Sequence, residues 1–177
     1  QTMNAFFSTS LLILLSACLL VCCANSAPAA DQGGVYSLVP DEFGMVLKTP
    51  QGQTVFRYMN KRPPDTKLTA NSVCCLFPVK TPAGEDVVEF APSDHPHHRG
   101  VFLAWHAIGG EIPADFWGWG QFAPTKDRVI TNRSLKAVAA DAKHAVIEAR
   151  NDWVAEGTTL IEETTTISAR QEQGVNV

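Results

Sequence analysis

The sequence predicts an all-β fold, an antiparallel β-sandwich, and three observations support this class. Short segments rich in Val, Ile, Thr and aromatic residues recur through the chain, and such residues favour strands. Long stretches with helical periodicity are missing from the sequence. The turn sequence T-P-x-G occurs twice, at 49–52 and 81–84, each time between two strand-like segments. Pro presets the backbone at the second position of such a turn and Gly follows it, so both copies predict a hairpin.

The positions of the strands follow from the same patterns. The first hairpin is predicted at 43–48 and 53–59, after a strand at 35–39, and the second hairpin at 73–80 and 85–90. A largely buried strand is expected at 100–108, and further strands at 128–135, 144–153 and 158–169. The Ala-rich stretch 136–143 favours a short helix instead. Glu162 and Glu163 are expected on the solvated face of the last strand.

Residues 1–30 have the pattern of a signal peptide. An apolar run from Leu11 to Ala24 is too short to span a bilayer comfortably, and small residues follow it. An N-terminal membrane anchor is the alternative, and lipid attachment at Cys18 is another. We therefore expect an exported protein, periplasmic or extracellular, without a membrane span once the leader is removed. Residues 31–177 are then expected to be the N-terminal part of one β-sandwich domain, truncated at the C-terminus, because the last residues resemble the entry to another strand.

The charge of the chain limits its partners. It has 14 Lys and Arg against 18 Asp and Glu, a formal net charge of −4, and no charged residue precedes Asp31. An acidic domain without a basic cluster argues against nucleic acid or an anionic membrane as the main partner. Outside the leader the cysteines are Cys74 and Cys75, which are adjacent and therefore badly placed for an unstrained disulfide. We expect two thiols on opposite faces of a strand.

The histidines gather in one part of the sequence. Three of the five lie in the segment DHPHHR at 94–99, and a fourth is His106. The residue before a proline favours extended backbone, so His95 and His97 should project to one side and His98 to the other. We take His95, His97 and His98 as candidate catalytic residues and Arg99 as a substrate-binding residue. His106, on the following predicted strand, is expected to be a core histidine.

Three chemistries fit this cluster. Two imidazoles and a carboxylate such as Asp94 are suitable ligands for a divalent metal. One imidazole could instead act as general acid or base, with a carboxylate fixing its tautomer. The histidines and Arg99 could also hydrogen-bond a polyhydroxylated ligand. A polar corner whose groups satisfy one another is the structural alternative, and the spacing specifies neither a metal ligand set nor a cofactor.

A second cluster is aromatic. Residues 115–122, DFWGWGQF, place glycines between large rings, and Trp105 precedes them. Glycine between rings lets a loop present its aromatic faces closely, which suits stacking on sugar rings. We therefore name Trp105, Trp117 and Trp119 as candidate substrate-binding residues. The alternative is a loop that closes one end of the sandwich with its own aromatic side chains.

These two clusters carry a resemblance to a known family. The sequence DHPHHRG at 94–100, followed by Trp105 and by DFWG at 115–118, resembles the exported bacterial family labelled PmoA-like or "methane oxygenase". The sequences PVKTPAG at 78–84 and LIEE at 160–163 agree with it as well, so that the resemblance covers most of 56–177. It implies a large mutarotase-like supersandwich, of which this chain holds the first part, and a role beside sugar-processing enzymes.

The leading expectation for function is an exported carbohydrate-active or carbohydrate-binding protein. The histidines and Arg99 would contact the sugar, Trp117 and Trp119 would stack on it, and one histidine would act as general acid or base in an enzyme. A metal-dependent oxygenase or hydrolase built on the same histidines is the second hypothesis. A non-catalytic glycan-binding module is the third. In each case the expected partner is a small molecule or a glycan.

Overall fold

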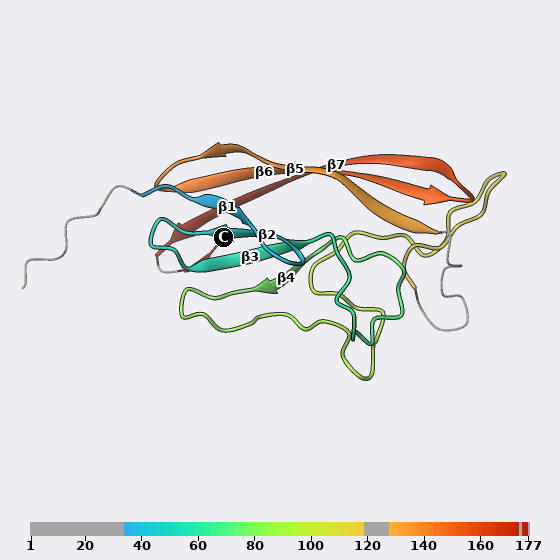
Figure 1. Cartoon of the computed structure of the whole chain (residues 1–177), viewed down its shortest axis with the longest axis horizontal. Coiled ribbons are helices and arrows are strands. Elements are labelled where there is room, and N and C mark those ends of the chain that lie inside the picture. The colour runs from blue at the N-terminus through green and yellow to red at the C-terminus, as the bar shows by residue number, and fades with distance from the viewer. Residues whose placement is uncertain (1–33, 119–127, 174, 177) are drawn as a thin grey trace, which may run out of the picture. The chain divides into compact units, whose positions relative to one another are not determined.

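The computed structural model describes residues 34–118, 128–173 and 175–176, and these belong to one compact unit, Asp31–Val177. The described residues form strands and irregular segments without a helix. The strands make two antiparallel sheets of four strands each, which lie in two layers (Figure 1). The predicted all-β class is therefore confirmed, and the arrangement is that of a β-sandwich. The predicted signal peptide, residues 1–30, lies outside the described residues, among which no helix is long and apolar enough to cross a membrane.

The first sheet contains the two predicted hairpin turns. Its strand order is β1 (Ser37–Pro40), β2 (Gly44–Lys48), β3 (Thr54–Met59) and β4 (Cys75–Val79). The turn between β2 and β3 closes where Thr49 N–H donates to Gln53 O at 2.8 Å, and Gly52 has a φ of 81°. The turn after β4 is built alike, with Gly84 at a φ of 88°. However, the expected return strand 85–90 is wrong, because this segment forms the isolated bridges Lys80–Asp86 and Phe90–Arg99 and no continuous strand.

The second sheet is built from long strands. Its order is β5 (Val129–Ala140), β6 (His144–Ala155), β7 (Thr158–Glu172) and β8 (Val175–Asn176). The helix expected at 136–143 is wrong, since β5 continues to Ala140 and pairs there with β6. Ala137 lies opposite Ile147 and Ala140 opposite Ala145. Pairing with a neighbouring strand thus overrides the helix propensity of alanine.

The core lies between the two layers. One cluster of buried side chains joins Leu47 and Phe56 of the first sheet to Ile147 and Ala169 of the second. Along β6 every second residue from Ala145 to Ala155 is buried, the period of two that places alternate side chains on one face of a strand. Cys74 and Cys75 are free and buried in different clusters, as expected for consecutive residues of an extended chain. Burial raises the pKa of Cys74 to about 11 and that of Cys75 to about 12.

A polar network interrupts this core. Glu163 of β7 lies opposite Asn151 of β6, and its carboxylate accepts hydrogen bonds from Asn151 Nδ2 at 3.1 Å and from Trp153 Nε1 at 2.6 Å. The hydroxyl of Tyr58, from the other sheet, donates a hydrogen bond to Asn151 Oδ1 at 3.0 Å. The expectation of a solvated Glu163 is therefore wrong. The alternation along β7 turns this side chain inward and leaves Glu162 exposed, because the two residues point to opposite faces.

The two glutamates provide a test of this network. Glu163→Ala leaves the Trp153 and Asn151 donors without their acceptor, and an unsatisfied buried donor costs about 1–3 kcal/mol. We expect the free energy of unfolding in urea to fall by about that amount for each donor. The matched control is Glu162→Ala, which removes an exposed carboxylate and should leave the unfolding midpoint unchanged. Equal effects of the two substitutions would contradict the assigned role of Glu163.

Candidate functional site

The segment that carries the candidate residues is irregular. The buried strand expected at 100–108 is wrong: Val101 forms one bridge with Leu76, and the exposed fractions of Leu103 and Trp105 are 52% and 55%. Gly100 explains the difference, because its φ of 66° turns the chain out of the extended path. A Cβ at this position would also stand 2.2 Å from the carbonyl oxygen of Leu76, so the close approach requires glycine.

The histidine segment forms a tight turn instead of an extended strand. His98 N–H donates to His95 O at 2.9 Å, with Pro96 at the second position, where a fixed φ near −65° suits such a turn. The expected alternation is therefore wrong, and all three rings gather together. The ring centroids of His95 and His98 are 4.8 Å apart and stacked, those of His97 and His98 are 4.4 Å apart, and those of His95 and His97 are 5.9 Å apart. We call residues 95–98 the histidine turn.

The three imidazoles differ in exposure. The side chain of His95 is 52% exposed and lies 3.0 Å from Asp94 Oδ2, whereas His97 as a residue is only 4% exposed. His98 is intermediate. The partly buried ring of Trp117 lies beside them, with its centroid 6.3 Å from that of His97 and 6.5 Å from that of His98. The structure therefore brings the histidines and one of the predicted tryptophans together.

Arg99 is fully buried beneath this group. Its Nη1 donates to the carbonyl oxygens of His97 at 3.2 Å and Trp117 at 3.5 Å, and its Nη2 donates to that of Phe116 at 3.4 Å. The guanidinium lies 3.9 Å from the ring centroid of Phe102. Burial lowers the pKa of Arg99 to about 10, which still leaves it charged at neutral pH. Arg99 thus joins the histidine turn to the loop at 116–117, and its contact with a substrate stays a prediction.

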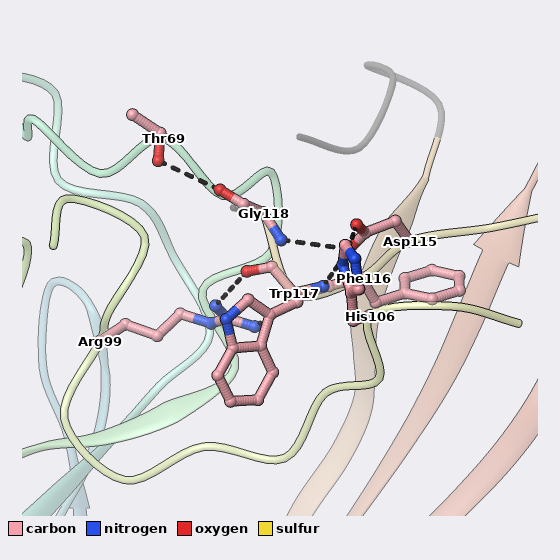
Figure 2. A network of polar contacts seen from close by, with 7 residues as sticks. All are labelled: Thr69, Arg99, His106, Asp115, Phe116, Trp117 and Gly118. Atoms are coloured by element: carbon pink, nitrogen blue, oxygen red, sulfur yellow. Dashed lines mark hydrogen bonds and ion pairs between the residues drawn. The ribbon is translucent and has the colours of Figure 1, made fainter. Parts of the chain in front are cut away.

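Asp115 organises the loop at 115–118, which Figure 2 shows beside Arg99. Asp115 Oδ1 accepts hydrogen bonds from the backbone N–H groups of Trp117 at 2.7 Å and Gly118 at 3.3 Å, an Asx turn. Asp115 Oδ2 lies 2.6 Å from His106 Nδ1. The expectation of a core histidine is wrong, because the side chain of His106 is 49% exposed. Sequence reasoning missed this pair, and the available signal was the Asx-turn pattern of an Asp followed closely by Gly.

The other predicted tryptophans are less well connected to the histidine turn. Trp105 is exposed and packs edge-on against buried Trp153, with centroids 5.6 Å apart. Its carbonyl oxygen accepts the N–H of Phe116 at 2.9 Å, which places residues 105–116 in an irregular hairpin. Trp119 lies outside the described residues. The candidate site is therefore the histidine turn with Trp117, which directly follows the hairpin that Trp105 begins.

A concave feature lies between the sheets. It is a cavity of about 240 Å³ whose lining includes Tyr58, Cys74, Phe102 and Glu163 but none of the predicted site residues. The Glu163 carboxylate in this lining accepts hydrogen bonds from Asn151 and Trp153. Within the described ranges, no three or more His, Cys, Asp or Glu side chains are grouped so that they could hold a metal ion.

The site residues all fall within one matched region. Residues 46–177 match a family of unknown function, DUF6807. The chain belongs to this family. The resemblance to the PmoA-like family is corrected by this match, since the segments that carried it, at 94–100 and 115–118, lie inside the DUF6807 region. No curated protein and no solved structure matches the chain.

Arg99 allows a test of what holds the candidate site together. Arg99→Lys keeps the charge but loses the planar fork, so one ammonium cannot reach the carbonyl oxygens of both loops in the same geometry. We expect a loss of about 1–3 kcal/mol in the free energy of unfolding, measured in urea. Arg133→Lys, at a side chain that is 57% exposed, is the control and should change nothing measurable. Equal stability of the two variants would show that Arg99 does not hold the loop.

His97 provides a test through pH. Burial, assisted by the neighbouring His98 and His95, lowers the pKa of His97 below 6.5. The His97 ring therefore binds a proton less readily in the folded protein than in the unfolded chain. Its neutral form contributes fully to the stability of the folded protein above pH 6.5, and this contribution is lost as the pH falls through the native pKa. We expect the free energy of unfolding to decrease more steeply as the pH falls below 6.5 in the unmodified protein than in His97→Asn. Parallel urea-derived curves for the two proteins would contradict this assignment.

Proposed function

We propose that this protein binds a carbohydrate at the histidine turn, with Trp117 as the stacking platform. The observation that carries the proposal is the position of three imidazoles next to one indole ring. A sugar presents hydroxyl groups around its rim and C–H groups on its faces. Neutral imidazole supplies one donor and one acceptor to hydroxyls, and an aromatic ring packs against the C–H face.

The exposure of the rings supports this reading. His95 is half exposed and His98 and Trp117 are partly exposed, so their edges can meet a ligand. His97 lies beneath them, in contact with the rings of His98 and Trp117. We propose His95 and His98 as the direct sugar contacts and His97 as the support that fixes their orientation.

The charge of the chain also favours a neutral ligand. With a formal net charge of −4 and no basic cluster in the sequence, the protein would repel anionic polymers and would not repel a neutral sugar. An exported location, periplasmic or extracellular, belongs to the same proposal because the apolar leader predicts it. If the protein is an enzyme that converts the bound sugar, His95 or His98 is the candidate general acid or base.

The proposal is tested by binding of neutral sugars. The full chain is titrated with D-glucose, D-galactose, D-mannose and their methyl glycosides, followed by calorimetry and by NMR shifts of the histidine and tryptophan rings. We expect binding to at least one sugar, with shifts at His98 and Trp117, and at least tenfold weaker binding by His98→Ala. A tenfold change corresponds to about 1.4 kcal/mol.

The control for this experiment is His144→Ala. His144 lies at the start of β6, is 47% exposed and pairs with Asp141, so it resembles His95 in exposure but lies outside the histidine turn. His144→Ala should bind as the unmodified protein does. No binding to any of the sugars, or equal loss of affinity in both variants, would refute the proposal.

A further inference from the structure

The cavity between the sheets combines apolar walls with one polar region. Its volume is about 240 Å³, and its walls are aliphatic and aromatic side chains such as Leu76, Phe102 and Ile167. We propose that this cavity is a second binding site, for a small organic amine with one apolar ring, whose ammonium group pairs with the Glu163 carboxylate. The inference goes beyond the proposed sugar site and does not depend on it.

The polar groups of the lining are joined to one another. The Tyr58 hydroxyl donates a hydrogen bond to Asn151 Oδ1 at 3.0 Å, and Asn151 Nδ2 donates to Glu163 Oε1 at 3.1 Å. The Thr165 hydroxyl donates to the same oxygen of Glu163. All four side chains line the cavity, so they form one polar region in a largely apolar lining. A few convergent polar groups in an apolar pocket are the usual composition of a small-molecule site.

Glu163 gives this polar region a negative charge that the lining does not balance. Among the described lining residues it is the one acidic side chain, and none is Lys, Arg or His. Burial, and next the charge of Glu163, raises the pKa of Cys74 to about 11, and burial raises the pKa of Cys75 to about 12, so both thiols are neutral at pH 7. Arg99 lies over the ring of Phe102 but is not part of the lining. The cavity therefore favours a cation over a neutral molecule and disfavours an anion.

The Glu163 carboxylate retains acceptor capacity for such a ligand. Its hydrogen-bond partners among the described residues are Asn151 and Thr165 at Oε1 and Trp153 at Oε2, the last at 2.6 Å. A carboxylate has about four acceptor positions, two on each oxygen. About one position on Oε2 therefore remains for an ammonium N–H, next to the indole of Trp153.

The size and the opening of the cavity limit the ligand to one ring. An apolar cavity of about 150 Å³ holds a benzene molecule, so one of about 240 Å³ accommodates a ring with a short side chain. Val101 and Leu103 belong to the lining and are each 52% exposed, so the cavity reaches the protein surface at 101–103. Benzylamine, in which one carbon joins the ring to a primary ammonium group, fits these limits.

Three probes of similar size and different charge test the proposal: benzylamine, benzyl alcohol and benzoate. The full chain is titrated with each, and binding is followed by ¹H–¹⁵N NMR at the indole of Trp153, whose Nε1–H donates to the Glu163 carboxylate. We expect saturable shifts with benzylamine, about tenfold weaker binding of benzyl alcohol and no binding of benzoate. Absence of saturable binding by benzylamine, or equal affinities for the amine and the alcohol, would overturn the proposal.

Two variants and a matched control locate the site. Glu163→Gln keeps an acceptor oxygen but removes the charge, and it should bind benzylamine about tenfold more weakly. Leu103→Trp fills the opening and leaves the polar network intact, so it should weaken binding by a similar factor even if Glu163→Gln is unstable. The control is Val138→Trp, because Val138 of β5 is also 52% exposed and is not part of the described lining. It should bind benzylamine as the unmodified protein does, and equal affinities of the Leu103 and Val138 variants would overturn the assigned location.

Discussion

The buried guanidinium of Arg99 is the interaction on which the candidate site depends. It donates to carbonyl oxygens of the histidine turn and of the loop at 116–117, two segments that have no strand pairing with each other. A planar cation with five donors can join several carbonyl oxygens at once, which a single ammonium cannot do. The position of Trp117 beside the imidazoles therefore depends on Arg99, together with the turn that Asp115 forms in the same loop.

Burying this cation requires compensation. Its Nε has no hydrogen-bond partner among the described residues, and burial lowers its pKa to about 10. The carbonyl oxygens and the ring of Phe102, 3.9 Å away, offset part of the lost hydration. Such an arrangement favours one geometry, because displacement of either loop would remove part of the hydrogen bonding of the buried charge. The cost of burial thus contributes to a unique site rather than to stability alone.

Several parts of the structure were predictable from local sequence. The turns at 49–52 and 81–84, the strands β2, β3 and β4 and the alternation along β6 depend on residues that are neighbours in the chain. The errors arose where distant residues decide. Strand pairing converts 136–140 into β5, and a positive φ at Gly100 prevents a strand at 100–108. The register of β7 turns Glu163 inward, where Asn151 and Trp153 of the adjacent strand provide donors for its carboxylate.

The sequence by itself determined that histidines and aromatic residues gather near 94–119, since this is a matter of composition along the chain. It also determined the all-β class through strand propensity and turn chemistry. Only the tertiary structure decided which of these side chains meet. The stacking of His95 on His98 depends on a turn, and the pairing of His106 with Asp115 depends on a hairpin. Both bring together residues that an extended chain would keep apart, and the backbone hydrogen bonds that fix them form only in the folded protein.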